Sequence, residues 1–325
     1  MKSNAENDSE LLINRQEDDS LFFSGSCFSD TFPSKLKKYK FNVWSQSHGI
    51  IFNPISLSRS ILDIAEGKVY RKEDLNQNDD VFFSYQHHGD FSSLDPELSL
   101  KMINEKISEQ HQAWGSAKRK VVILTLGTSF VYELKETGAI VANCHKMPGH
   151  LFTKRMLSVK EIMSGLEKVV KLLSPNDELI LTVSPVRHYR DGLIENNQSK
   201  GALLLAIKYL QEQYPQIKYF HSYEMIIDEL RDYRYFEKDG VHPNELAVEY
   251  VWNEFQNRLL LVKERERVRD FDSLFLSLNH RPKFPGSNAS KKFFSSLQSQ
   301  FEQLKAKYPS LNFDEEQQQL NDLRL

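Results

Sequence analysis

The chain has 325 residues, of which 40% are hydrophobic, a size that suits one large domain or a domain with an extension. Its 42 basic and 45 acidic side chains leave a net charge of −3, so we expect neither nucleic acid nor an anionic membrane surface as a partner. With two cysteines, no secretory signal in MKSNAENDSE and no apolar stretch long enough to span a membrane, we expect a soluble cytoplasmic protein without a disulfide framework.

The predicted elements begin at residue 20, after a polar tail over residues 1–19 that is expected to be mobile. Near-continuous apolar runs at residues 21–24, 120–126, 179–183 and 217–220 predict parallel strands that are covered on both faces. Four amphipathic patterns between and after these runs predict helices. Their apolar faces are Leu100, Ile103, Ile107 and Trp114; Ile162, Leu166, Val169 and Leu173; Leu203, Ile207, Leu210 and Tyr214; and, in a helix expected to start at Pro243, Leu246, Tyr250, Val251, Phe255 and Leu259. The alternation favours a doubly wound α/β sheet.

Two segments depart from this alternation. Residues 130–134 and 139–143 flank the turn sequence KETG and predict a hairpin inserted after a sheet strand. Beyond residue 261 the sequence becomes charged, helical and rich in Gln, with a Pro/Gly break at residues 281–286. We therefore divide the chain into the tail, a domain over residues 20–261 and a helical extension over residues 262–325. The extension either packs on the domain or mediates self-association.

The first candidate site is the joint after the first predicted strand, where residues 21–30 read LFFSGSCFSD. Gly25 permits a sharp turn, and Ser26 and Cys27 then come near the first turn of the next helix, where unpaired N–H groups favour an anion. A cysteine in such a position has a lowered pKa and a larger thiolate fraction. The alternative is a structural corner in which Ser26 caps the helix and Cys27 is buried.

The second candidate site is the loop DGVHPN over residues 239–244, directly before the last predicted helix of the domain. A carboxylate at Asp239 can accept the Nδ1 proton of His242 across the glycine turn, which leaves Nε2 as a base. The alternative is a simple turn followed by a histidine that caps the helix. A nucleophile early in the chain with Asp and His late and adjacent is one chain order for a catalytic triad.

Together these stretches resemble the SGNH/GDSL hydrolase superfamily, and in particular its GSCFA branch. The resemblance covers roughly residues 20–260. Its matching stretches are GSCFS at 25–29, GIIFNPIS at 49–56, LGTSFVY at 126–132, VANCHK at 141–146, SPVRH at 184–188 and DGVHPN at 239–244. It implies a flavodoxin-like three-layer α/β/α sandwich with a triad at the carboxyl edge of the sheet.

The resemblance also implies roles for single residues. The superfamily's Gly-Asp-Ser falls on Gly25-Ser26-Cys27, which makes Cys27 the expected nucleophile, with Ser26 as the alternative through a one-residue shift. Asp239 and His242 complete the triad.

The oxyanion hole departs from the superfamily pattern. Gly49 is expected to supply one N–H donor. The asparagine amide of the superfamily's third block is missing, because that block reads Gly127-Thr128-Ser129 here. Losing one such donor typically costs on the order of a hundredfold in rate, so hydrolysis needs a replacement. The candidates are the Ser129 hydroxyl, the Thr128 backbone, and Asn143 or His145 at the end of the predicted hairpin.

Further polar residues follow the predicted strands. Arg187 and His188 come after the strand at residues 179–183, where they either face a substrate carboxylate or phosphate or stabilise the loop. Cys144 and His145 are adjacent in sequence and, with His87, have poor spacing for tetrahedral zinc. No metal and no cofactor is therefore expected.

The sequence thus predicts an esterase or acyl hydrolase. Its substrate would be an ester or thioester of a small molecule, a glycan or a lipid, attacked by a nucleophile–His–Asp triad. Two alternatives stay open. One is an acyltransferase that uses the same site, and the other is a ligand-binding module on the hydrolase fold without catalysis.

Overall fold

The computed structural model describes residues 12–323 apart from 14, 27 and 285, so most of the predicted N-terminal tail and the candidate nucleophile Cys27 lie outside the described residues. The chain forms two compact units. The first holds the described residues up to Lys35 together with Asn42–Leu259, and the second holds Leu36–Phe41 and the described residues from Leu260 onward. None of the described helices is long and apolar enough to cross a membrane.

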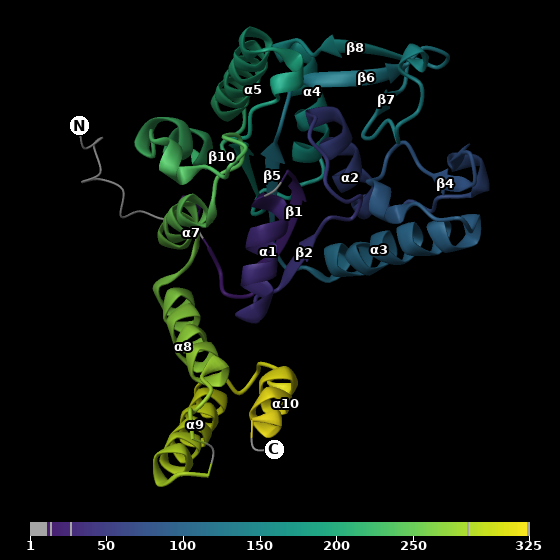
Figure 1. Cartoon of the computed structure of the whole chain (residues 1–325). Helices are drawn as coiled ribbons and strands as arrows, with labels where there is room; N and C mark the ends of the chain where they lie inside the picture. Colours follow the sequence, from purple (N-terminus) through teal and green to yellow (C-terminus); the bar gives the residue numbers. More distant parts are fainter. Residues whose placement is uncertain (1–11, 14, 27, 285, 324–325) are drawn as a thin grey trace. The chain divides into compact units, whose positions relative to one another are not determined.

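The core of the first unit is a five-stranded sheet in which every neighbouring pair is parallel (Figure 1). Its strands, in spatial order, are β10 (Ile217–Tyr219), β9 (Glu178–Val183), β5 (Lys120–Leu126), β1 (Ser20–Gly25) and β2 (Val43–Ser45). This is the flavodoxin-like order, whose switch point lies between β1 and β5. The parallel sheet and the four predicted strands are confirmed, and the short strand β2 was missed.

Helices cover both faces of this sheet, which makes the unit a three-layer α/β/α sandwich. They are α1 (Phe28–Lys38), α2 (Pro54–Glu66), α3 (Pro96–Ser116), α4 (Val159–Val170), α5 (Leu193–Gln213), α6 (Ser222–Glu224), which continues as a π-helix over Met225–Glu229, and α7 (Glu245–Leu259). Side chains such as Phe22, Val122 and Leu181 pack with α2, α3, α4 and α5 in the main hydrophobic core. Short 3₁₀ turns lie at Lys72–Asp74, Gly89–Phe91, Gly149–Leu151, Tyr189–Asp191 and Tyr233–Tyr235.

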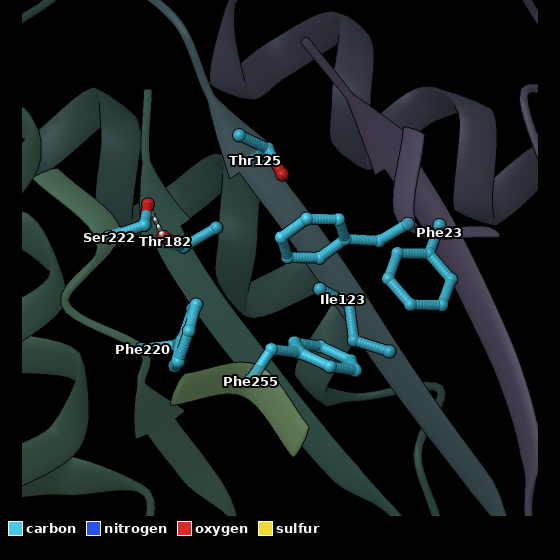
Figure 2. Close-up of a pocket in the computed structure, with 8 residues that line it drawn as sticks. Phe23, Ile123, Thr125, Thr182, Phe220, Ser222 and Phe255 are labelled. Atoms are coloured by element: carbon cyan, nitrogen blue, oxygen red, sulfur yellow. Dashed lines mark hydrogen bonds between the residues drawn. The ribbon is translucent and has the colours of Figure 1, made fainter. Parts of the chain in front are cut away.

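The opposite face of the sheet packs mainly through aromatic rings. Phe255 of α7 contacts Phe23 of β1 at 6.3 Å and Phe220 at 5.8 Å between ring centroids. Figure 2 shows these rings around a pocket, with the hydrogen-bonded Thr182 and Ser222 hydroxyls on one side. The volume of the pocket is only about 10 Å³, and the two hydroxyl oxygens are 2.6 Å apart. A space of this size holds no more than one water molecule, so this pocket is a packing defect of the core rather than a ligand site.

Local sequence signals explain where most helices begin. Ser158 and Glu161 form a capping box at the start of α4. The predicted start of the last helix of the domain at Pro243 is wrong by two residues, because Pro243 instead forms a β-bridge with Phe236. The Asn244 side chain accepts from the Ala247 N–H at 3.2 Å, and α7 begins at Glu245.

The predicted hairpin is confirmed and is part of a separate three-stranded sheet. Strand β6 (Phe130–Leu134) pairs antiparallel with β7 (Ile140–Val141) and with β8 (Phe152–Met156). The sequence interpretation missed β8 because its pattern, FTKRM, carries charged side chains on a short edge strand. A further hairpin joins β3 (Asn76–Asn78) to β4 (Val81–Phe83).

The second unit is helical, as expected for the C-terminal extension. Its helices are α8 (Val262–Asn279), α9 (Asn288–Lys307) and α10 (Asp314–Asp322). Phe271 is fully buried and stacks on Phe313 at 5.6 Å between ring centroids. Tyr39, from the short N-terminal segment of this unit, donates its hydroxyl to Asp272 at 2.7 Å. The extension therefore has its own core.

Gly25, at the end of β1, is required by the close approach of β5. Its φ is +141°, and a Cβ there would lie 2.4 Å from the carbonyl oxygen of Thr125. We expect Gly25→Ala to lower the free energy of unfolding by about 3 kcal/mol or more, measured by urea denaturation. The control is Gly115→Ala in α3, where no atom would approach the new Cβ within 4 Å and a gain of about 0.5–1 kcal/mol is expected. An unchanged midpoint for Gly25→Ala would contradict this strand packing.

Candidate active site

A large cavity lies at the carboxyl edge of the central sheet. Its volume is about 930 Å³, which is in the range of small-molecule sites. Ser26 after β1, Thr128 after β5 and Ser184 after β9 all line it. Asp239 and His242 line the same cavity, so two loops more than two hundred positions apart in the sequence meet there. This is the place where parallel α/β sheets bind ligands.

Ser26 is one of the two candidate nucleophiles, and the structure describes it fully. It is 2% exposed, its N–H donates to the Thr125 carbonyl at 3.3 Å, and its Oγ has no hydrogen-bond partner among the described residues. The hydroxyl is therefore not bonded to His242 in this arrangement. The other candidate, Cys27, lies outside the described residues.

Asp239 and His242 form a hydrogen-bonded pair. His242 Nδ1 lies 2.6 Å from Asp239 Oδ2, while Asp239 Oδ1 accepts from the backbone N–H groups of Val241 at 2.8 Å and His242 at 3.0 Å. The backbone N–H of His242, its ring and the N–H of Val241 lower the pKa of Asp239 to about 2. The ionised Asp239 can only accept, so Nδ1 carries the shared proton, and in the neutral imidazole Nε2 is the acceptor.

The loop that carries this pair is held by its own backbone. The Glu237 N–H donates to the His242 carbonyl at 2.7 Å, and the Gly240 N–H donates back to the Glu237 carbonyl at 2.9 Å. Gly240 adopts a φ of +67°, which glycine reaches without strain. Both side chains of the pair remain about half exposed, so solvent or a ligand can reach the imidazole.

The oxyanion donors expected from the sequence are largely engaged elsewhere. The Gly49 N–H donates to the Gln46 carbonyl at 3.1 Å, and Gly49 is not among the residues that line the cavity. Ser129 is fully buried, donates its N–H to Ser199 Oγ at 2.8 Å and does not line the cavity either. The Phe52 carbonyl accepts from the N–H groups of Gly127 at 2.8 Å and Thr128 at 3.2 Å.

Asn143 is placed differently from these donors. It lines the cavity, and its Oδ1 accepts the His145 N–H at 2.9 Å, while its Nδ2 makes no hydrogen bond to a described residue. His145 itself does not line the cavity. Its Nε2 lies 2.9 Å from the Ser84 carbonyl and 3.0 Å from the His87 carbonyl, and its ring stacks on Phe83. His145 therefore braces the loop that presents Asn143.

Basic side chains line the side of the cavity formed by the loop after β9. Arg187 and His188 both lie there, as the sequence suggested. The His188 ring packs edge-on against Phe52, and burial, helped by the nearby Lys200 ammonium, lowers the pKa of His188. Arg187 is half-buried and has no hydrogen bond or ion pair with a described residue.

The small antiparallel sheet supplies an apolar wall on another side. The apolar lining side chains from β6, β7 and β8 and the loop between them are Phe130, Val131, Tyr132, Val141, Ala142, Met147 and Phe152. Lys154 of β8 also lines the cavity, with its ammonium 4.7 Å from the centroid of the Phe130 ring. Such a wall suits an aliphatic or aromatic part of a ligand.

Lys200 is a buried residue that the sequence interpretation missed. It lies on α5, is 2% exposed, and places Nζ 2.5 Å from the Gly127 carbonyl and 2.6 Å from the Ser184 carbonyl. Burial lowers the pKa of Lys200 to about 7. The available signal was a lysine three positions before Leu203 on the apolar face of an amphipathic helix. Lys200 joins the loops after β5 and β9 under the cavity.

A second buried network was also missed. His48 Nε2 lies 2.8 Å from Asp63 Oδ2, which also accepts the Tyr70 hydroxyl at 2.7 Å. His87 stacks on His48 at 4.3 Å, and its pKa is lowered well below the ordinary value, first by burial and then by His48. Neither histidine lines the cavity, so this network supports the loops around it. Among the described residues, no cluster of His, Cys, Asp or Glu side chains is suited to hold a metal ion.

Comparison with known proteins gives matches to two family models. No curated protein and no solved structure matches the chain. The model described as the GSCFA domain protein, C-terminal domain, matches residues 271–323, and the model of the GSCFA family matches residues 20–255. Since the second match spans most of the chain, including the sheet and the whole cavity, this protein belongs to the GSCFA family.

Proposed function

We propose that the protein is a hydrolase of esters or thioesters that works through a nucleophile, His242 and Asp239. One observation carries this proposal: an imidazole held by an ionised carboxylate lines the same cavity as the joint after β1. Such a pair has the arrangement of a general base and the residue that orients it.

In this mechanism the nucleophile attacks the carbonyl carbon while His242 Nε2 accepts its proton. Asp239 stabilises the imidazolium that forms. The same Nε2 then donates the proton to the leaving alcohol or thiol. Water attacks the acyl-enzyme in a second step, again with His242 as the base, and releases the acid.

Asn143 is the residue that best fits the missing oxyanion donor. Its Nδ2 group faces no competing acceptor among the described residues, whereas the N–H groups of Gly49 and Ser129 already donate to other partners. An amide side chain is also the same chemical group as the asparagine that the third block lacks.

Cys27 remains the expected nucleophile, with Ser26 as the alternative. The Ser26 hydroxyl is buried without a partner, so it lacks the bond to His242 that would activate it. The test is hydrolysis of p-nitrophenyl acetate and butyrate by the wild type, Cys27→Ala and Ser26→Ala, combined with iodoacetamide labelling and mass spectrometry. Alkylation of Cys27 and Cys27→Ala are each expected to lower kcat/KM at least about a hundredfold.

The second cysteine makes the labelling interpretable. Burial raises the pKa of Cys144, so its thiol is less reactive than an exposed one, and a Cys144→Ala variant assigns the labelled position. Loss of activity in Ser26→Ala alone would assign the serine. Full activity in both nucleophile variants would refute the triad.

An acyltransferase is the second candidate, and the size of the cavity favours it. A volume of about 930 Å³ has room for an acceptor beside an acyl group. The two reactions differ in their response to an added acceptor. A transferase releases p-nitrophenol faster, and forms an acylated product, when an alcohol such as glycerol is present. A hydrolase releases p-nitrophenol at an unchanged rate, and the acyl group appears only as the free acid.

A further inference from the structure

We infer that the cavity contains a binding site for an anionic group, centred on Arg187, so that the preferred substrate is an ester with an apolar acyl part and a carboxylate or phosphate. The site itself does not depend on the proposed hydrolysis, but the statement that its ligand is an ester does.

The inference begins with the charged side chains that line the cavity. Only two of them are acids, and each is already engaged. Asp191 is paired with Lys154, and Asp239 is bonded to His242. No lining carboxylate is therefore left to neutralise Arg187 from within the described part of the cavity.

Two guanidinium groups remain without such a partner. Arg187 and Arg190 both line the cavity, and neither makes an ion pair or hydrogen bond with a described residue. A half-buried arginine commonly has a carboxylate or carbonyl partner, because guanidinium N–H groups lose hydration on burial. Arg187 lacks one, and a planar guanidinium binds carboxylate and phosphate oxygens in a two-pronged arrangement. The structure thus leaves a strong anion-binding group facing the cavity.

The position of Arg187 determines where in the cavity the charged end of a ligand would lie. It belongs to the loop after β9, whereas the apolar wall comes from β6, β7 and β8. A ligand that fills both parts has a charged end and an apolar end. Such amphiphilic ligands gain affinity from burial of the apolar end and specificity from the paired charge.

The test measures binding rather than turnover, so it stays informative if hydrolysis fails. Octanoate, octyl phosphate and octanol share an eight-carbon chain, and each is titrated into the full-length protein by isothermal calorimetry. We expect both anions to bind at least about tenfold more tightly than octanol, with an affinity that falls as salt is raised. Tighter binding of octyl phosphate identifies a phosphate site and tighter binding of octanoate a carboxylate site; either result supports the inference.

Variants then assign the effect to Arg187. Arg187→Gln is expected to weaken binding of the anions about 10- to 100-fold and to leave octanol within twofold, while Arg187→Lys keeps part of the difference. Arg231→Gln is the control, because Arg231 is exposed and does not line the cavity. The inference is overturned if octanol binds as tightly as the anions, if none of the three binds, or if Arg187→Gln leaves the affinity for the anions unchanged.

Discussion

His242→Ala is expected to lower kcat/KM for p-nitrophenyl esters roughly a thousandfold, because it removes the imidazole that the ionised Asp239 holds in the cavity. Asp239→Asn keeps the ring but loses the charge that holds Nδ1 as the protonated nitrogen. We expect it to cost roughly a hundredfold or more, since the imidazole is then no longer held in the required tautomer. Steady-state kinetics on both variants measures these losses.

The control for this pair is His280→Ala. His280 belongs to the C-terminal unit, where it packs on Phe293, and its loss is expected to change kcat/KM by less than about twofold. If purified wild-type protein shows turnover and His242→Ala retains it, the triad is excluded. If the wild type binds octanoate or octyl phosphate but hydrolyses nothing, the protein is a binding module on the hydrolase fold.

Lys200→Met is expected to destabilise the protein by about 2–4 kcal/mol near pH 10. The substitution keeps the length of the side chain but leaves the carbonyls of Gly127 and Ser184 without the donor that now bonds them, and a buried carbonyl without a partner costs about 1–3 kcal/mol. The two carbonyls match the two N–H groups of a neutral amine, so the neutral form of Lys200 satisfies both. Urea denaturation of the wild type and the variant measures the difference.

Near pH 7, Lys200→Met is expected to have about the same free energy of unfolding as the wild type. Burial lowers the pKa of Lys200 from 10.5 to about 7, so between these values the unfolded chain binds a proton that the folded chain does not. The wild type is therefore stabilised as pH rises through this window, by at most about 1.4 kcal/mol per pH unit, and Lys200→Met lacks that gain.

The measured quantity is thus the difference in free energy of unfolding between the wild type and Lys200→Met as a function of pH. The titration of all groups that the two proteins share cancels in this difference. Lys208→Met, on the exposed side of the same helix, is the control and is expected to stay within about 0.5 kcal/mol of the wild type at each pH. If the wild type is more stable than Lys200→Met by the same free energy at pH 7 and at pH 10, burial does not lower the pKa of Lys200 in solution.

The features that could be predicted from sequence are those that neighbouring residues determine. The strands were recognisable because both faces of a parallel sheet are covered, which leaves continuous apolar runs such as KVVILTL. The hydrogen bond between Asp239 and His242 spans three residues and a glycine turn, so residue types and spacing alone suggested it. The capping box at Ser158 is local in the same sense.

The features that were not predictable depend on contacts between distant segments. Lys200 reaches carbonyls 73 and 16 positions away, and no local pattern states where those carbonyls lie. The choice between Asn143 and Ser129 as the group facing the cavity also depended on which hydrogen bonds each one makes in the folded chain. Helix α7 begins later than predicted because Pro243 forms a β-bridge with Phe236, seven positions earlier. The sequence signals for a helix start do not include such a partner.

The small sheet of β6, β7 and β8 has a practical consequence for altering the protein. It is a separate three-stranded sheet that shares no strand with the five-stranded sheet, so its hydrogen bonds do not maintain the central scaffold. Substitutions of its lining side chains Tyr132, Val141 and Phe152 would reshape one side of the cavity while the residues beside β1 and before α7 stay where they are. Selectivity for the apolar part of a ligand is therefore most readily engineered there.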